Sequence, residues 1–328
     1  MSNVSDQNST VINDIPFGYL ICHIFTLLSL SVGILISSMT LCILIFYRRS
    51  YFDVATLLTC NTCVANLLLC VTIGDLILSG LYDDRYLGSV NIVTPPNRWC
   101  ITRYVLMCGF IASFYHSYIL QAANRVFRVI FYRHKFLQNY LLYLITISIQ
   151  WFISFLIIMP VLFWNVILYL ENEHYCQAPL SSNSTFYTAF TIYFIPLLIM
   201  IPMYIWIWLH IRRSTSNTLR KQQNLRDFLV LKRLIIQMSV LISVGFPVMA
   251  IWIVYLITGY LHPYTHRIQW LTVSFGLACI SVMIILLTPN LKNVLCNIIK
   301  SVTRLQTNRI IPAGEIMNQT RNSATNLC

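Results

Sequence analysis

Charged residues are scarce in this chain of 328 residues: they make up 10% of it, while hydrophobic residues make up 57%. Soluble domains contain about 25% charged residues, so the composition argues against a water-soluble enzyme. The apolar residues gather in blocks, and a helix that spans a bilayer needs roughly 20 mostly apolar residues. We expect seven spanning helices, or six if the short seventh block does not insert. The blocks are Tyr19–Phe46, Val54–Leu81, Ile101–Phe131, Leu141–Leu168, Phe186–Ile211, Leu229–Thr258 and Ile268–Leu287.

The N-terminus lacks the pattern of a cleavable signal peptide. The residues before Tyr19 are polar and acidic, without a basic start followed by a short apolar stretch. The first apolar block is also too long for such a peptide. We therefore expect this block to insert directly as a helix, with its short N-terminal tail translocated.

Acidic residues are few beside the basic ones, 10 against 22, which gives a net charge of +12. If the N-terminus is outside, all but four of the basic residues fall on the cytoplasmic side; the exceptions are Arg85, Arg98, Arg103 and Arg267. Basic loops stay cytoplasmic during insertion. The distribution therefore predicts an extracellular N-terminus and contact with anionic inner-leaflet lipids, and it argues against nucleic-acid binding.

Glycosylation sequons agree with this orientation. Asn3, Asn8 and Asn183 each begin an Asn-x-Ser/Thr triplet on the expected outer side. Asn318 begins a further triplet on the cytoplasmic side, which we interpret as a chance match. We expect glycans on one or more of the three outer asparagines.

Most of the eleven cysteines lie inside apolar blocks and are expected to be packing residues. Cys60 and Cys63 are one helical turn apart in such a block, without the further ligands that a metal site requires. Cys100 instead falls at the outer start of the third block and Cys176 in the outer loop between the fourth and fifth blocks, where thiols can persist as a disulfide. We expect a disulfide that fixes the second outer loop over the bundle; two free thiols are the alternative.

Several motifs match landmarks of one membrane-protein family. Asn124-Arg125-Val126 stands at the inner end of the third block, where that family carries an Asp-Arg-Tyr-like triplet, and Cys100 lies at the matching distance before it. With seven helices and the two outer cysteines, the chain resembles the rhodopsin-like G-protein-coupled receptors from about Tyr19 to Leu305. Further landmarks are Trp151 and Pro160 in the fourth block, Pro196 and Tyr204 in the fifth, and Pro247 in the sixth.

The resemblance implies an all-α membrane protein with a seven-helix bundle and a short amphipathic eighth helix. The expected parts are an extracellular tail (1–18), the transmembrane domain (19–289), an interfacial helix (290–305) and a cytoplasmic tail (306–328). It implies a plasma-membrane receptor without a cofactor, whose partners are an extracellular ligand and a heterotrimeric G protein. The eighth helix also follows from the helical spacing of apolar residues after Pro289. Cys296 beside its apolar stripe is a candidate for palmitoylation, or a buried free thiol.

The chain departs from the family at three positions. The aspartate of helix two is replaced by Asn66, the run Val244–Pro247 lacks the tryptophan of helix six, and Pro289 is not followed by the tyrosine of helix seven. A receptor-like protein that no longer couples is therefore an open alternative.

For signalling, Arg125 is the leading candidate, because a charge inside a membrane helix is costly without a partner. The family's adjacent aspartate, which pairs with this arginine, is Asn124 here, so the resting state is expected to be looser. Snorkelling of Arg125 to the interface is the alternative. The full set of expected coupling residues is Asn124, Arg125, Val126, Tyr204, Arg212, Arg213, Lys232 and Arg233, and the expected hinges are Pro196, Pro247 and Pro289.

The sequence lacks the side chains that bind two well-known ligand classes of this family. The position of the aminergic aspartate in helix three is Met107, and the seventh block has no lysine for retinal. The expected pocket residues are Asp75, Tyr104, Met107, Ile111, Trp252, Tyr255, Gln269 and Trp270. The acidic residues above them, Asp83, Asp84, Glu171 and Glu173, favour a peptide or a small neutral ligand. Ordinary interfacial aromatics and solvated loop charges are an equal alternative.

Two other classes of membrane protein are weaker candidates. A transporter or channel would show repeated halves and several charges at mid-depth, but no repeat is visible, and Asp75 is the only acid well inside an apolar block. A membrane enzyme would need a set of catalytic or metal-binding side chains, whereas His23, His116 and His210 are scattered.

Overall fold

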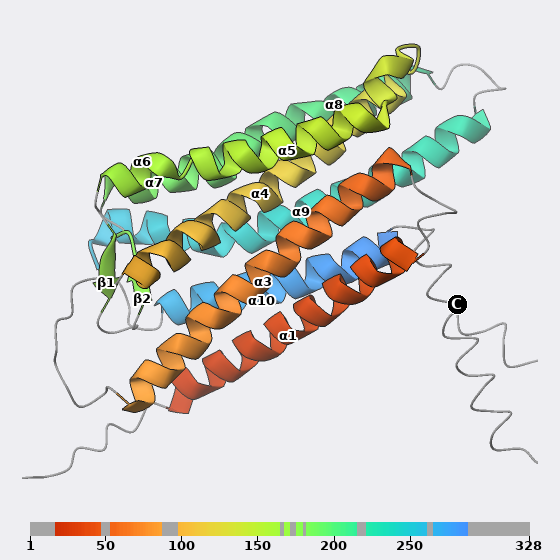
Figure 1. The fold of residues 1–328 in the computed structure, drawn as a ribbon. Helices are drawn as coiled ribbons and strands as arrows, with labels where there is room; N and C mark the ends of the chain where they lie inside the picture. The colour runs from red at the N-terminus through yellow and green to blue at the C-terminus, as the bar shows by residue number, and fades with distance from the viewer. Residues whose placement is uncertain are drawn as a thin grey trace, which may run out of the picture.

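The chain is a multi-pass membrane protein built as a bundle of helices. The computed structural model describes residues 17–46, 53–86, 98–164, 167–170, 175–179, 182–214, 221–260 and 265–287. Within these residues, seven helical spans are long and apolar enough to cross a membrane. The spans lie side by side with their long axes in roughly one direction (Figure 1). This confirms the all-α seven-helix fold, while the eighth helix, 290–305, lies outside the described residues.

The elements follow one another in a simple up-and-down order. They are α1 (Phe17–Phe46), α3 (Val54–Tyr86), α4 (Arg98–Val129), η1 (Lys135–Gln138), α5 (Tyr140–Leu156), α6 (Met159–Phe163), β1 (Leu168–Leu170), β2 (Tyr175–Gln177), α7 (Asn183–Ala189), the π-helical η2 (Phe190–Phe194), α8 (Ile195–Ser214), α9 (Lys221–Thr258) and α10 (Thr265–Leu287). Two of the spans are therefore composite: α5 with α6 forms the fourth, and α7, η2 and α8 form the fifth.

One predicted boundary is wrong. The fourth block was expected to remain helical to Leu168, but α5 ends at Leu156, α6 ends at Phe163, and Leu168 begins β1. Pro160 is the second residue of α6 and cannot donate a backbone hydrogen bond to the turn before it. β1 then pairs antiparallel with β2, with Tyr169 opposite Cys176. This β-hairpin lies at the end of the bundle where α1 and α4 begin (Figure 1); we call it the hairpin end.

Local capping explains several helix starts. The Asp53 Oδ1 atom accepts a hydrogen bond from the Val54 amide at 2.7 Å, at the start of α3. Asn139 accepts from the Leu141 amide at 3.2 Å before α5, and Ser182 accepts from the Thr185 amide at 3.3 Å before α7. Asp, Asn and Ser are the residues that best satisfy the open amides of a first helical turn.

The surface of the bundle suits lipid. Large apolar side chains such as Phe152 and Phe163 are 69% and 80% exposed, on the outside of the fourth span. Monomeric soluble proteins rarely expose broad apolar patches, whereas a bilayer requires them. The third span, α4, is the most buried of the seven and packs against α3, α5 and α8. It is the central helix of the bundle.

Buried polar side chains join the helices inside the bundle. Asn61 of α3 donates to Gln150 Oε1 of α5 at 2.8 Å and accepts from the Trp151 indole at 2.8 Å. Asn66 of α3 donates to Ser37 of α1 at 2.9 Å and to Ser281 of α10 at 2.8 Å. Such bonds join membrane helices because lipid offers polar groups no alternative partner. Asn66, predicted to replace the family's aspartate, thus links three helices.

Candidate functional site

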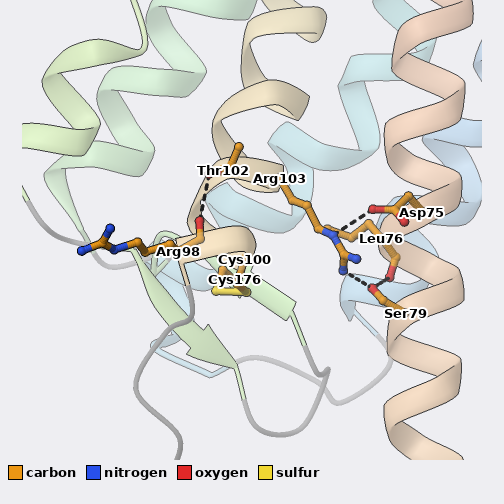
Figure 2. Close-up of a disulfide and its surroundings, with 8 residues drawn as sticks. All are labelled: Asp75, Leu76, Ser79, Arg98, Cys100, Thr102, Arg103 and Cys176. Carbon is orange, nitrogen blue, oxygen red and sulfur yellow. Dashed lines mark hydrogen bonds and ion pairs between the residues drawn. A yellow bond between two sulfur atoms is a disulfide. The ribbon is translucent and has the colours of Figure 1, made fainter.

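The hairpin end is closed by a disulfide. Cys100, near the start of α4, bonds to Cys176 of β2, with their Cα atoms 5.6 Å apart and a separation of 76 positions in sequence (Figure 2). This confirms the predicted pairing. The bond ties the β-hairpin to the central helix, as the sequence analysis expected for the second outer loop.

The hairpin is also held by aromatic contacts to the last helix. The Trp270 indole of α10 donates to the Tyr175 hydroxyl at 3.3 Å, and the two rings meet edge to face. Tyr175 also makes an edge contact with the ring of His266. Tyr175, Trp270 and His266 are all buried. These aromatic contacts therefore hold β2 against the first turns of α10.

The one acid expected in the ligand pocket has a cationic partner. Arg103 of α4 places its Nε atom 2.8 Å from Asp75 Oδ2 of α3, and its NH1 group donates to Ser79 Oγ at 2.7 Å (Figure 2). The guanidinium also lies 5.4 Å from the centre of the Trp99 ring. The Asp75 side chain is 50% exposed. Asp75 thus links α3 to α4 and is not a carboxylate held open for a ligand.

The other expected pocket residues differ in burial and do not line a single pocket. Tyr104 and Met107 are buried in the core, and Ile111, Tyr255 and Gln269 are half-buried. Trp252 of α9 lies 5.5 Å from the Phe186 ring of α7, and its buried indole nitrogen has no hydrogen-bond partner in the described part of the chain. Of the expected set, only Trp270 lines a small pocket between α1, α3, α10 and β2. The described residues that line this pocket are Cys22, His23, Thr26, Leu76, Ile77, Gly80, Tyr175, Arg267 and Trp270.

The opposite end of the bundle carries the expected coupling residues. Asn124, Val126 and Tyr204 are buried, and Arg125 is half-buried. Arg125 lies near the end of α4, and Tyr204 belongs to α8, which packs against α4. Arg212 and Arg213 are exposed in the last turn of α8, and Arg212 lies 5.4 Å from the Trp208 ring. The side chains of Lys232 and Arg233 lie outside the described residues.

A second ion pair lies at this end. Arg128, one turn beyond Arg125, places its NH1 atom 3.4 Å from Asp53 Oδ2, and both side chains are more than half exposed. Exposed pairs of this kind contribute about 0–1 kcal/mol. Arg128 is therefore a peripheral cation and differs from the half-buried Arg125 on the same helix.

One of the expected hinges lies next to an irregular helical segment. Pro196 is the second residue of α8, which continues from the π-helical segment η2, and Pro247 lies inside the continuous helix α9. α8 contains a further proline, Pro202, inside the helix. π-helical turns and prolines are the usual causes of bends in helices. Pro289 lies outside the described residues.

A close contact that the sequence analysis missed lies beside the α9 proline. A Cβ atom on Gly245 would lie 2.0 Å from Cε2 of Tyr193, so the Tyr193 ring fills the space that a side chain would take. The Tyr193 hydroxyl donates to the Ile242 carbonyl at 3.1 Å, and its ring meets Tyr115 of α4 edge to face. Gly245 stands in the run where the family's tryptophan is missing. The signal in the sequence was a glycine two residues before a helix proline, but its partner in η2 could not be identified without the structure.

Of the expected glycosylation and palmitoylation sites, the structure describes one asparagine. Asn183 is exposed at the first residue of α7, on the hairpin end. Asn3, Asn8 and Cys296 lie outside the described residues.

No protein-family model matches the chain, and no curated protein matches it.

Proposed function

We propose that this protein is a plasma-membrane receptor of the rhodopsin-like type. In this proposal the hairpin end faces the extracellular side and binds a ligand, and the opposite end activates a heterotrimeric G protein. The observation that carries it is the seven-helix bundle whose third span bears a disulfide to the hairpin at one end and the half-buried Arg125 near the other. The resemblance described above assigns those two features to ligand entry and coupling.

The orientation follows from charge. Arg212 and Arg213 lie in the last turn of α8, at the end of the bundle opposite the hairpin, where Arg125 and Arg128 also lie. Positive residues flanking spans are retained in the cytoplasm, and a disulfide needs an oxidising compartment. Both arguments support an extracellular hairpin end. Anionic lipids of the inner leaflet would meet the basic end.

This orientation gives a direct prediction. An epitope tag placed after Cys328 should stain permeabilised cells only, while a tag before Met1 should stain intact cells. Treatment with a glycosidase should lower the apparent mass of the protein, and Asn183→Gln combined with Asn3→Gln and Asn8→Gln should abolish that shift. Staining of the C-terminal tag on intact cells would overturn the orientation.

Movement at the basic end is proposed to occur about the prolines. Pro247 interrupts the hydrogen bonding of α9, and Pro196 follows the π-helical turn of the fifth span. Rotation of the inner half of α9 about Pro247 would open the cytoplasmic end between α8 and α9. Arg125 and Tyr204 would then be accessible to a G protein.

In this proposal, Asn124 determines how much of the protein adopts the active state without ligand. A charged hydrogen-bond partner contributes roughly 1.5–3 kcal/mol, and a neutral one about 1 kcal/mol. A difference on the order of 1 kcal/mol changes a population several-fold. We therefore expect measurable signalling without ligand in cells that express the wild-type protein. Asn124→Asp should reduce it at equal surface expression.

The test of coupling in cells uses a matched pair of arginines. Arg125→Gln should abolish ligand-independent activation across all G-protein classes, whereas Arg128→Gln, one turn away and exposed, should leave it near the wild-type level. Equal effects of the two substitutions would show that only general positive charge matters. Unchanged signalling in Asn124→Asp would mean that Asn124 is a neutral packing residue.

A further inference from the structure

An ion pair near the hairpin end is exposed on the surface of the bundle. Arg103 of α4 reaches Asp75 and Ser79 of α3 (Figure 2). Half of the Asp75 side chain remains exposed, although this residue lies within the second membrane span. Charged side chains inside spans normally face the interior of the bundle or a water-filled cavity. What Asp75 can bind therefore depends on the side of α3 on which it lies.

Asp75 lies on the lipid-facing side of α3. Residues three, four or seven positions away share its face of the helix. Such residues are 48%, 56% and 60% exposed in the order Val71, Leu78 and Tyr82. The α3 residues that line the small pocket toward α1 and α10 lie on the opposite side of the helix; they are Leu76, Ile77 and Gly80. The face that carries Asp75 is therefore turned outward, where the bundle meets the bilayer.

The depth of the ion pair matches the level of lipid headgroups. The span Val54–Tyr82 has 29 residues and is about 43 Å long at 1.5 Å per residue, which equals the thickness of a bilayer with its headgroups. Asp75 lies about 10 Å before the end of this span, and Arg103 about 8 Å after the start of its own span at Arg98. Both residues are thus near the boundary between headgroups and hydrocarbon, and the long arginine side chain can extend toward the headgroups.

The charges of this part of the chain balance one another. The stretch from Asp75 to Arg103 contains three acidic and three basic residues: Asp75, Asp83, Asp84, Arg85, Arg98 and Arg103. A guanidinium has five N–H donors, so Arg103 can bind an anionic oxygen while it keeps its contacts with Asp75 and Ser79. The exposed ring of Trp99, 5.4 Å from the Arg103 guanidinium, is the type of surface that binds quaternary ammonium groups. These features suit a zwitterion better than an ion with a net charge.

We propose that this surface binds the headgroup of a zwitterionic phospholipid. The outer α3–α4 surface consists of Val71, Asp75, Leu78, Tyr82, Trp99 and Arg103. Arg103 binds the phosphate, Asp75 and Trp99 hold the ammonium group of choline or ethanolamine, and the acyl chains lie along Val71 and Leu78. The ion pair stays formed and positions the two charges. This site goes beyond the proposed receptor function and needs neither an extracellular ligand nor a G protein.

Photo-crosslinking in detergent locates the bound lipid. The probes are a phosphatidylcholine and a phosphatidylglycerol that carry the same diazirine near the start of one acyl chain. Light releases nitrogen from the diazirine, and the carbene inserts into a neighbouring bond of the purified full-length protein. Peptide mapping would measure the label in residues 71–82 and 99–106. The label in the fourth span, whose Phe152 and Phe163 are exposed, gives the level for lipid that is not bound at a site.

We expect the choline probe to label the outer α3–α4 surface more than the glycerol probe, by about fivefold after division by the fourth-span label, which is the effect of one exposed charge pair. Asp75→Asn leaves Arg103 without its counter-charge and should bring this ratio to about one or below. Arg103→Gln should lower the label from both probes, because both lipids carry a phosphate. The opposite ion pair is the control: Asp53→Asn and Arg128→Gln should leave the ratio within about twofold of the wild-type value. An unchanged ratio in Asp75→Asn would overturn the proposal.

Competition on the wild-type protein does not depend on any variant folding. Excess unlabelled sphingomyelin has the same phosphocholine headgroup on a different backbone and should remove most of the label from residues 71–82 and 99–106. Diacylglycerol, which has acyl chains but no charged headgroup, should not. Equal competition by the two lipids, or equal labelling by the choline and glycerol probes, would overturn the proposal. No G protein takes part, so the lipid site and the proposed coupling can fail independently of each other.

Discussion

Replacement of Cys100 by alanine is expected to remove most of the protein from the cell surface. Its partner Cys176 is 1% exposed in β2, next to Tyr175, which packs on Trp270. Loss of a native disulfide costs about 2–5 kcal/mol in small secreted domains, and here the loss falls on the hairpin that closes the bundle. We expect at least a several-fold drop in surface protein, measured by flow cytometry with an N-terminal tag.

Two controls separate the disulfide from the loss of a thiol. Cys60→Ala removes a free, half-buried cysteine of α3 and should leave surface expression near the wild-type level. The double variant Cys100→Ala, Cys176→Ala has no unpaired outer thiol from this pair and should remain as poorly expressed as the single variant. Wild-type expression of the double variant, or peptide mapping that finds both thiols free in mature protein, would contradict the account.

The second large effect is expected at Gly245. Alanine there would place a methyl group 2.0 Å from the Tyr193 ring, which no side-chain adjustment of alanine can relieve. Tyr193 is buried, bonded to the Ile242 carbonyl and packed on Tyr115. Overpacking of this kind typically costs about 1–3 kcal/mol. We expect Gly245→Ala to lower the thermal unfolding temperature of the purified protein and to change its signalling.

Another helix glycine provides the matched control. A Cβ atom on Gly74 of α3 would have no heavy atom within 4 Å, so Gly74→Ala should be neutral or stabilising, by at most about 1 kcal/mol. Tyr193→Ala should relieve the clash, so the double variant with Gly245→Ala should be more stable than the sum of the single effects predicts. Strict additivity of the two substitutions would show that Tyr193 does not occupy the space at Gly245 in the membrane.

The helices could be predicted from the sequence because each span is a local property of composition. An apolar run of sufficient length inserts wherever it stands, so the starts at Val54 and the ends at Phe46 and Thr258 agree with the structure. The predicted end of the fourth helix is wrong because the apolar run continues through Ile167 and Leu168 into β1. Hydropathy alone cannot distinguish a helix end from an apolar strand. Pro160 was the available signal, and it was assigned only as a family landmark.

The candidate site was predicted less well because it depends on how the helices are rotated against one another. The disulfide between Cys100 and Cys176 could be predicted because the order of the spans places both cysteines at the same end of the bundle. The direction of the Asp75 side chain follows from the rotation of α3, and its pairing with Arg103 from the register of α3 against α4. Arg267 reaches His23 across 244 positions of sequence. Neither the Asp75–Arg103 pair nor the Arg267–His23 pair could be predicted from residue spacing in a single sequence.

Nucleotide exchange with purified components tests the central claim most directly. The wild-type protein in lipid nanodiscs would be mixed with purified heterotrimers of each G-protein class, and the uptake of a non-hydrolysable GTP analogue would be followed without ligand. The account predicts faster uptake than with empty nanodiscs for at least one class, lost in Arg125→Gln and kept in Arg128→Gln. No acceleration for any class, from protein whose Cys100–Cys176 disulfide is intact, would contradict it.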